Sequence, residues 1–537
     1  MKNNNNLSIY IHTPFCKSKC NYCNFYSINP ENINGAELQQ IYNMHSMYGS
    51  SHSHNNNNNY NNSHNNNNNH NNKLNHNHNN IHDIYLQSLI KELKIISEKY
   101  NLSGNSAHTH SRIVKTIYFG GGTPSVMGIN FFDEIINNIY KTFAVSEHPE
   151  ITAEVNPESA DFNKLKSLRS VGINRLSIGA QSFNDNVLKI AGRLHSSADI
   201  LRCVNDSRKC GFDNISLDLI LGLPGQTAEI LQKDIDYLIS IRPEHISSYI
   251  LSIEKGSIFY KNLKKLYMRS EDKENCESSE YEHSESGYGE DKERKEDEDD
   301  ELADFYITAS EKFSNSGYKH YEISNFALNG FESKHNINYW ERGEYIGLGP
   351  SASSFIKQTA NRAAHNNADD NSSSVNIDDN INGSSANMNN NYDYKDYRDR
   401  DRDSGVLKNK LEIRITNEAN IIKYINKILN FEKKILQSEN KTNKLRKYKI
   451  KEFKTDEEIL TKKDIINEKI FLSLRIHKGI DTKIIYKYVD RKVIDALIKA
   501  GFAEIYTTGD MLHMRHYLRL TLKGMLISSE IFSKILL

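Results

Sequence analysis

Three cysteines near the start of the printed sequence constrain this chain more than any other feature. Cys16, Cys20 and Cys23 are separated by three residues and then by two. On so short a loop, three thiolates can converge on one inorganic centre, and we interpret them as a ligand set and not as a disulfide framework. Iron-sulfur clusters are normally held by four cysteine thiolates. Three would hold a [4Fe-4S] cluster and leave one iron open to a cofactor or substrate.

Two other interpretations of the same cysteines stay open at this point. A structural zinc site would need a fourth Cys or His nearby, and His12 is the only local candidate, in the apparent strand before the loop. Unrelated free cysteines are the other alternative. Cys203, Cys210 and Cys276 have no ligand spacing, so we interpret them as ordinary thiols. Six cysteines in 537 residues fit a reducing compartment.

Composition and charge exclude several classes of protein. The formal net charge is −1, so no overall field favours nucleic acid or a membrane surface. No apolar run approaches the roughly 18 residues of a membrane span. The six residues before the first predicted strand are too short for a signal or transit peptide. We therefore expect a soluble cytoplasmic protein with no membrane span and no nucleic-acid partner.

Strand-like and helix-like segments alternate through the first half of the chain, which predicts parallel strands with crossover helices. We expect an α/β fold, a partial barrel of about six βα units, with chemistry at the carboxyl ends of its strands. The expected strands are Leu7–Ile11, Thr116–Phe119, Ile151–Glu154, Arg175–Ile178, Ile215–Leu221 and His245–Leu251, with Tyr318–Ile323 completing the barrel. The expected helices are Phe131–Phe143, Asp161–Ser170, Asp185–Ala191 and Thr227–Ser240, preceded by one that Asp83 caps.

Three segments of biased composition interrupt this pattern. Residues 46–80 are rich in Asn, His and Ser, residues 270–300 in charged residues and Ser, and residues 360–404 in Asn and Asp. Such segments bury too little apolar surface to offset the entropy of ordering, so we expect disordered insertions. The basic run at 441–454 lacks interleaved stacking aromatics and indicates a solvated linker, not a nucleic-acid site.

The remaining pattern predicts three parts. Residues 1–355 form the barrel domain, residues 356–461 a linker, and residues 462–537 a small α-rich domain. In the last part, helix-like segments at 465–474, 483–489 and 491–500 precede short strand-like pieces.

A glycine run and several polar residues follow predicted strands. Gly120, Gly121 and Gly122 precede Thr123, and consecutive glycines let the backbone approach a ligand closely. A tight βα turn is the alternative interpretation of the run. The isolated polar candidates, each also compatible with a purely structural role, are Glu154, Gln181, Arg193 and Asp218.

The cysteine spacing, with aromatic Tyr22 before the last cysteine, resembles the signature of radical S-adenosylmethionine (radical SAM) enzymes. In that superfamily the open iron binds SAM, and cleavage of SAM releases a 5′-deoxyadenosyl radical. The flanking motifs from Tyr10 to Cys16 and from Asn24 to Ser27 are similar to those of the oxygen-independent coproporphyrinogen III oxidase family, which includes haem-chaperone relatives. The resemblance also implies a winged-helix-like fold for residues 462–537.

The resemblance assigns roles to the candidate residues. Gly121 and Gly122 belong to a motif whose backbone carbonyls bind the methionyl amino group of SAM. Glu154 is expected to accept hydrogen bonds from the ribose hydroxyls of SAM or from its ammonium group. Arg193 suits the methionyl carboxylate, since arginine clamps carboxylates in a bidentate manner. The full set of implied SAM-binding residues is Tyr10, Gly121, Gly122, Thr123, Glu154, Gln181, Arg193 and Asp218.

A later motif bears on haem. His335, Tyr339 and Trp340 match the His-Asn-x-x-Tyr-Trp motif of the haem-chaperone branch, where the histidine is a candidate haem ligand. An ordinary core patch at a domain junction is the alternative. Downstream, Ser353 stands where relatives carry a histidine.

Two departures favour the haem-chaperone branch. The oxidase branch carries another cysteine where this chain has Phe25, and an N-terminal extension where only fifteen residues precede Cys16. The first hypothesis is therefore a haem carrier, with haem as cargo, haem-accepting proteins and an electron donor as partners.

The enzyme alternative is oxidative decarboxylation of coproporphyrinogen III, so whether the chain is an enzyme stays open. Radical SAM chemistry on RNA is more remote, because a basic, aromatic-rich platform is missing. Because eukaryotic chaperone-like members are often mitochondrial, the mitochondrion is the alternative to the cytoplasm.

Overall fold

The computed structural model describes residues 6–37, 39, 41–43, 72–100, 102, 112–262, 290–359, 410–437, 456–509 and 514–536. Most of each predicted insertion, the basic run and Cys276 lie outside these residues. No helix in the described part of the chain combines the length and apolar character that a membrane crossing requires.

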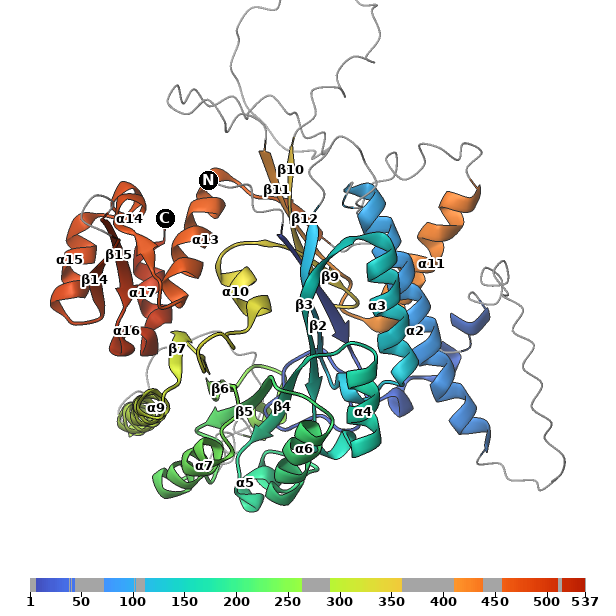
Figure 1. Cartoon of the computed structure of the whole chain (residues 1–537), viewed down its shortest axis with the longest axis horizontal. Coiled ribbons are helices and arrows are strands. Elements are labelled where there is room, and N and C mark those ends of the chain that lie inside the picture. The colour runs from blue at the N-terminus through green and yellow to red at the C-terminus, as the bar shows by residue number, and fades with distance from the viewer. Residues whose placement is uncertain are drawn as a thin grey trace, which may run out of the picture.

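One sheet organises the larger part of the molecule (Figure 1). Its twelve strands follow the order β12-β11-β10-β9-β1-β2-β3-β4-β5-β6-β8-β7. The strands are β1 (Asn6–Thr13), β2 (Ile113–Gly121), β3 (Ala144–Val155), β4 (Arg175–Gln181), β5 (Ile215–Leu221), β6 (His245–Ile250), β7 (Lys319–Glu322), β8 (Asn325–Ala327), β9 (Glu344–Leu348), β10 (Ser353–Thr359), β11 (Lys410–Thr416) and β12 (Asp456–Ile459).

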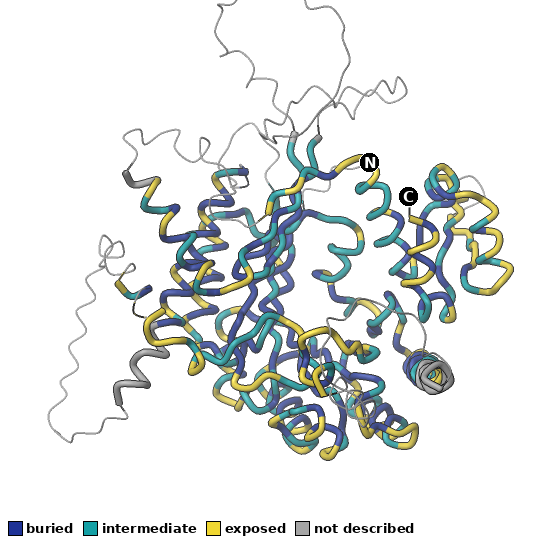
Figure 2. Tube along the Cα trace, turned by 180° about the vertical axis from the view of Figure 1, so that it is seen from behind, coloured by how far each residue is buried: buried dark blue, intermediate teal, exposed yellow. Residues whose placement is uncertain are grey.

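Strands β1 to β6 pair in parallel and in chain order, which confirms the predicted α/β fold with a six-unit partial barrel. Helices cover the outer face of the curved sheet. The helices of this part of the molecule, of which α10 lies on the opposite side of the sheet from α2 and α3, are α2 (Asn72–Lys99), α3 (Ile129–Thr142), α4 (Phe162–Ser170), α5 (Asp185–Ile190), α6 (Ser197–Lys209), α7 (Ala228–Ile241), α9 (Glu290–Asn315), α10 (Lys334–Trp340) and α11 (Ile421–Gln437). Buried residues run along the central strands, as expected of parallel strands covered on both faces (Figure 2).

Two predictions about element positions are wrong. The segment Tyr318–Ile323 does not complete the barrel as a parallel strand, because β7 turns back onto β8, and β8 pairs antiparallel with β6. Helix α2 begins at Asn72 and not after Asp83, so the first insertion ends earlier than residue 80. A helix whose later turns are packed extends by one hydrogen bond per added residue, which lets weakly helix-forming residues join it.

The predicted linker over residues 356–461 is also wrong in part. Strand β11 pairs antiparallel with β10, and β12 pairs with β11, so both extend the main sheet. Helix α11 packs against α2, and the backbone N–H of Ile421 donates a hydrogen bond to Tyr26 Oη at 2.7 Å. This stretch therefore supports the cysteine loop directly.

The C-terminal part forms a second, smaller unit, coloured orange to red in Figure 1. Its three-stranded sheet has the order β13-β15-β14 and packs with short helices, as a winged-helix-like arrangement requires. Its elements are α13 (Lys462–Arg475), β13 (Ile480–Asp481), α14 (Thr482–Tyr488), α15 (Arg491–Lys499), β14 (Ala503–Thr508), β15 (Arg515–Leu520), α16 (Leu522–Leu526) and α17 (Ser528–Ile535).

Candidate functional site

The cysteine loop follows the carboxyl end of β1 and is fixed at both of its ends. The N–H of Cys16 donates to the carbonyl of Ile28 at 2.9 Å, next to a bridge between Phe15 and Ile28. Farther along, the N–H of Asn21 donates to the carbonyl of Ala191 at 3.0 Å, after α5. The loop is thus attached both to its own strand and to the β4 side of the barrel.

The glycine run at the end of β2 lies directly against this loop. A Cβ atom on Gly122 would lie 2.8 Å from the carbonyl oxygen of Phe15 and 3.0 Å from Cys16 Sγ. Gly121 has a φ of 114°, in the region that favours glycine, and a Cβ there would meet the His12 ring. Both glycines are therefore needed for the backbone to pass this close to the cysteines.

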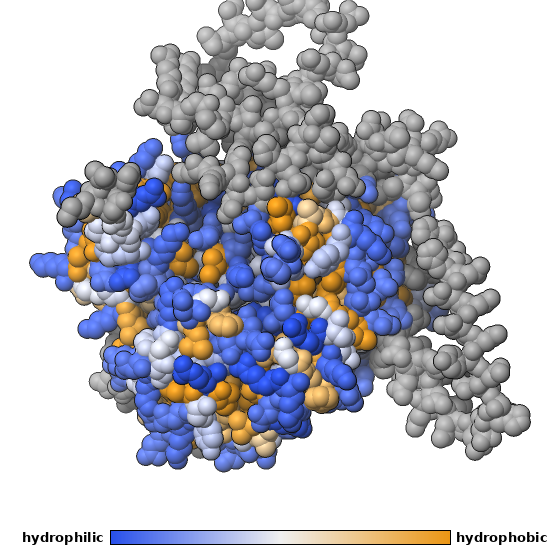
Figure 3. All heavy atoms as spheres, viewed as in Figure 1, coloured by the Kyte–Doolittle hydropathy of each residue, from blue (hydrophilic) through white to orange (hydrophobic). Residues whose placement is uncertain are grey.

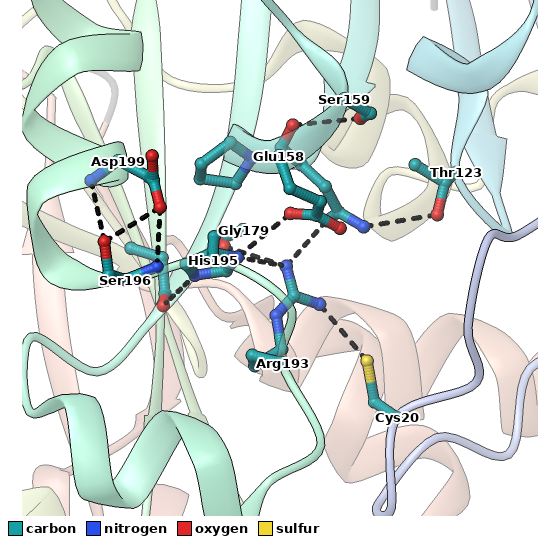
Figure 4. A network of polar contacts seen from close by, with 12 residues as sticks. Cys20, Thr123, Glu158, Ser159, Gly179, Arg193, His195, Ser196 and Asp199 are labelled. Carbon is teal, nitrogen blue, oxygen red and sulfur yellow. Dashed lines mark hydrogen bonds and ion pairs between the residues drawn. The ribbon is translucent and has the colours of Figure 1, made fainter.

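A chain of polar contacts connects two of the three cysteines. Thr123 Oγ1 lies 3.3 Å from Cys16 Sγ and accepts a hydrogen bond from Asn156 Nδ2 at 3.2 Å. Asn156 Oδ1 in turn accepts from Arg193 Nη2 at 2.8 Å, and Arg193 Nη1 donates to Cys20 Sγ at 3.3 Å. Figure 4 shows Arg193 pointing toward Cys20, with Thr123 across the network. The strand ends of β2, β3 and β4 are in this way joined around the cysteine loop.

The three thiols suit a thiolate-bound cluster. Cys16, Cys20 and Cys23 are all unpaired, so no disulfide competes for them. Burial raises the pKa of the Cys16 and Cys23 thiols, which favours a bound cationic centre over free thiolates. No three His, Cys, Asp or Glu side chains in the described ranges converge closely enough for a single metal ion. A [4Fe-4S] cluster places each thiolate on a different iron, so the donor set fits a cluster better than zinc.

Glu154 lies at the end of β3 with both oxygens already engaged. It accepts hydrogen bonds from Tyr118 Oη at 2.9 Å and from the N–H of Gly121 at 3.0 Å. Burial is the main reason why the pKa of Glu154 rises to about 7. A carboxyl group held in this state can exchange a proton near neutral pH or pair with a ligand cation.

Asp218, Gln181 and Tyr10 also lie at the barrel interior. Asp218 accepts from Ser177 Oγ at 3.1 Å, and burial raises its pKa. Gln181 ends β4 with a left-handed φ of 68°, a conformation that costs free energy in a residue with a side chain. Tyr10 Oη lies 3.1 Å from His12 Nδ1.

Sequence reasoning did not identify three residues of this network. Tyr118 and Asn156 hold Glu154 and Arg193, and His195 lies 3.4 Å from Arg193 Nη2 while its Nδ1 contacts Glu158 at 3.1 Å. For Tyr118 and Asn156, a position near or just after the carboxyl end of a strand was the available signal, whereas His195 lies between α5 and α6 and had no such signal. That signal does not separate residues that meet across the barrel from those that do not.

The haem candidates lie elsewhere. His335 is 1% exposed, and its Nδ1 lies 2.7 Å from Thr116 Oγ1 while its Nε2 lies 2.9 Å from Tyr339 Oη. The Arg475 guanidinium lies over the Trp340 ring, 4.5 Å from the ring centroid. Thr116 pairs with Ser8 near the start of β1, away from the cysteine loop. In this arrangement His335 has no free ring nitrogen to offer to haem iron, which argues against the expected ligand role.

The comparisons with known proteins agree with this fold. A family model described as the radical SAM superfamily matches residues 106–238. Among solved structures, coproporphyrinogen III oxidase (HemN) from Escherichia coli aligns with a TM-score of 0.57 and 18% identity, covering 98% of this chain and 89% of its own. Fold and cysteine loop together define a radical SAM protein, a class that implies a [4Fe-4S] cluster and SAM.

Two curated relatives make the relationship more specific. "Heme chaperone HemW" of Bacillus subtilis is 30% identical over 359 residues, which cover 66% of this chain and 72% of the relative. "Heme chaperone HemW" of Lactococcus lactis is 33% identical over 277 residues, covering 51% of this chain and 62% of the relative. The chain belongs to the HemW family.

Proposed function

We propose that this protein is a haem chaperone, which binds haem and passes it to haem proteins. The observation that carries the proposal is the exposed side chain of Phe25 on the cysteine loop, within a chain of the HemW family. Phe25 is 69% exposed, at the position where the oxidase branch is expected to carry a further cysteine. An apolar side chain there cannot supply the thiol, but it suits contact with a porphyrin face.

Cys16, Cys20 and Cys23 would hold the [4Fe-4S] cluster, which when bound supplies an iron open to SAM. For SAM, Arg193 supplies a guanidinium beside Cys20, and Glu154 on β3 and Asp218 on β5 supply carboxylates on either side of β4. Tyr10, Gln181, Thr123 and the backbone of Gly121 and Gly122 complete the proposed pocket. Arg193 orients the bound carboxylate, since its guanidinium is already held by Asn156.

An apolar rim surrounds the cysteine loop and offers a surface for the haem macrocycle. Its members are exposed apolar side chains on the loop and on segments that hydrogen-bond to it or neighbour it. In the lower part of Figure 3, hydrophobic side chains gather where Figure 1 places β4 to β6 and α5 to α7. The rim consists of Phe25, Ile190, Leu194, Ile253 and Ile258.

The partners that follow are haem, haem-accepting proteins and an electron donor for the cluster. We place the protein in the cytoplasm, with the mitochondrion as the alternative, since the unpaired cysteines among the described residues fit a reducing compartment. The second candidate function, coproporphyrinogen III oxidation, is favoured only by the fold that the chain shares with HemN.

The test is an anaerobic assay of the iron-reconstituted protein. With haem added, we expect a Soret band that survives desalting and disappears when an apo-haem protein is supplied as acceptor. With SAM, a reductant and coproporphyrinogen III, we expect no loss of carboxyl groups by mass spectrometry. Decarboxylated product that Cys20→Ala abolishes would instead make the protein an oxidase. Phe25→Ser serves as a second variant, expected to keep the cluster and to weaken haem binding.

A further inference from the structure

Positive charge gathers on the surface around the cysteine loop. Three segments form this surface: the loop at residues 14–28, the end of α5 with the residues after it at 187–194, and the segment after β6 at 251–262. Together they contain one acidic residue, Glu254, and a set of lysines that we call the lysine face. The lysine face consists of Lys17, Lys19, Lys189, Lys255 and Lys261. The net charge of the whole chain is −1, so this positive charge is a local feature.

Hydrogen bonds at Asn21 hold the three segments together. The N–H of Asn21 donates to the carbonyl of Ala191 at 3.0 Å, and Asn21 Nδ2 donates to the carbonyl of Ile190 at 2.8 Å. The carbonyl of Asn21 accepts a hydrogen bond from the N–H of Phe259 at 2.9 Å. The lysines of the second and third segments therefore lie around the loop that carries Lys17 and Lys19.

The charges of the lysine face are not neutralised within the described structure. All five lysines are exposed, and none of them forms an ion pair or a side-chain hydrogen bond with a described residue. Other exposed lysines do form ion pairs, for example Lys319 with Glu332 at 3.0 Å. Like charges gathered on one face attract a partner of opposite charge and speed its association.

The cysteines proposed to hold the cluster lie close to solvent at this face. Cys20 and Cys23 are half-buried, whereas Cys16 is buried. Residues 17–19, between the first two cysteines, are exposed. Electron transfer between proteins slows steeply with distance, so a donor has to approach where little protein separates it from the cluster. The lysine face meets this requirement.

We propose that the lysine face is the docking surface for an acidic electron-donor protein. The donor gives up one electron, and the cysteine-bound cluster takes it up. The proposal rests on the cluster and the electron donor proposed above, and not on haem binding. Exposed Phe25 lies on the same loop and belongs to the apolar rim, so the donor and haem occupy this face in turn.

The test uses a plant-type ferredoxin, a small acidic [2Fe-2S] protein, as the donor. The rate at which the reduced ferredoxin reduces the reconstituted cluster should fall about tenfold from low to high salt. The double variant Lys189→Glu/Lys255→Glu, outside the cysteine loop, should lower the low-salt rate about tenfold. Lys492→Glu/Lys499→Glu is the matched control, because these lysines are exposed on α15 of the C-terminal unit, and it should keep the wild-type rate.

The methyl viologen radical, a small cationic reductant, separates charge from damage to the site. It should reduce Lys189→Glu/Lys255→Glu at least as fast as wild type, because added negative charge attracts a cation. Slower reduction of this variant by both reductants would overturn the proposal. Equal rates with ferredoxin for this variant and the control would do the same.

A second readout needs neither the cluster nor haem. Carbodiimide cross-linking of cluster-free wild type to oxidised ferredoxin, followed by mass spectrometry, should join ferredoxin carboxylates mainly to the lysine face. Cross-links that are absent from this face, or no more frequent there than on Lys492 and Lys499, would overturn the proposal. So would weaker haem binding by Lys189→Glu/Lys255→Glu with unchanged cross-linking, which would assign the lysines to haem propionates. Wild type that binds no haem ends the proposed function and leaves both ferredoxin readouts valid.

Discussion

Gly122 makes the closest approach between the glycine run and the cysteine loop, and its role is purely steric. Gly122→Ala should reduce the iron and sulfide content after reconstitution several-fold, because the added methyl would displace the Phe15 carbonyl and Cys16. Gly128→Ala is the control, since nothing lies within 4 Å of a Cβ there. Iron content and the absorbance near 400 nm measure the effect. Equal iron in the two variants would show that the close approach is not required.

The Glu154 carboxyl gives a prediction about pH. Its folded-state pKa of about 7 exceeds the usual value, so the folded protein binds more protons between about pH 4.5 and 7. The protonated Glu154 carboxyl therefore contributes to the stability of the fold below about pH 4.5, and this contribution is lost as the pH rises from about 4.5 to 7. Glu154→Gln should therefore stabilise the cluster-free protein at pH 8 by about 1–3 kcal/mol, allowing for the partial exposure of the side chain.

Urea denaturation at pH 5 and pH 8 tests this effect, and the same variant should bind SAM at least tenfold more weakly by calorimetry. A Gln variant whose stability follows the wild-type pH profile would show that Glu154 ionises normally. Asp206→Asn on the outer helix α6 is a suitable control, since the ion pair of Asp206 within the described residues is a local one with Lys209.

At the scale of an element, helix α10 shows why a motif does not reveal accessibility. The pattern His-Asn-x-x-Tyr-Trp indicates which residues occur, but His335 points inward because Ser333 caps the helix and Glu150 accepts the His335 N–H at 3.0 Å. We expect His335→Ala to cost about 2–4 kcal/mol, since it leaves a cavity and removes a hydrogen-bond partner of Thr116. Haem binding by the folded variant should persist.

The buried His335 imidazole also gives a prediction about how the stability of the fold changes at acidic pH. The folded-state pKa of about 3 lies below the usual value, so the unfolded chain binds more protons between about pH 6.5 and 3. Stability from the neutral imidazole is complete above pH 6.5 and falls as the pH drops through this window. Thermal midpoints from pH 7 to pH 4 should fall more steeply for wild type than for His335→Ala. Parallel curves, or loss of the Soret band in folded His335→Ala, would contradict the structural role.

The sequence pattern predicted most of the barrel elements, because the periodicity of apolar residues and the positions of turn residues reflect the local backbone conformation. Strands β1, β2, β4, β5 and β6 and helices α3, α4, α5 and α7 lie within a few residues of their expected bounds, whereas β3 begins at Ala144 and not at Ile151. Helix α6 was not predicted, although Ser196 and Asp199 form its capping box. The cysteines and Arg193 could be identified from motifs. The contact from Asn156 to Arg193 could not, because it depends on how β3 and β4 pair.

At the scale of the whole molecule, the sheet joins segments that are far apart in the sequence. Strand β11 was assigned to a linker because its partner β10 is separated from it by 50 residues that lie outside the described structure. Pairing across such a distance leaves no local signal. The same is true of the Tyr26 contact with Ile421, through which α11 supports the cysteine loop.

The pairing of β10 with β11 gives the last prediction. Thr359 and Lys410 are opposite each other in the antiparallel register, so a short turn can join them directly. Replacing residues 360–409 by four residues containing Asn-Gly should raise stability by about 2 kcal/mol, because closing a shorter loop costs less entropy. Cluster content and haem binding should match wild type, and a scrambled segment of the original length is the control. Lower stability or lost iron in the shortened chain, with the scrambled control intact, would show that residues 360–409 support the site.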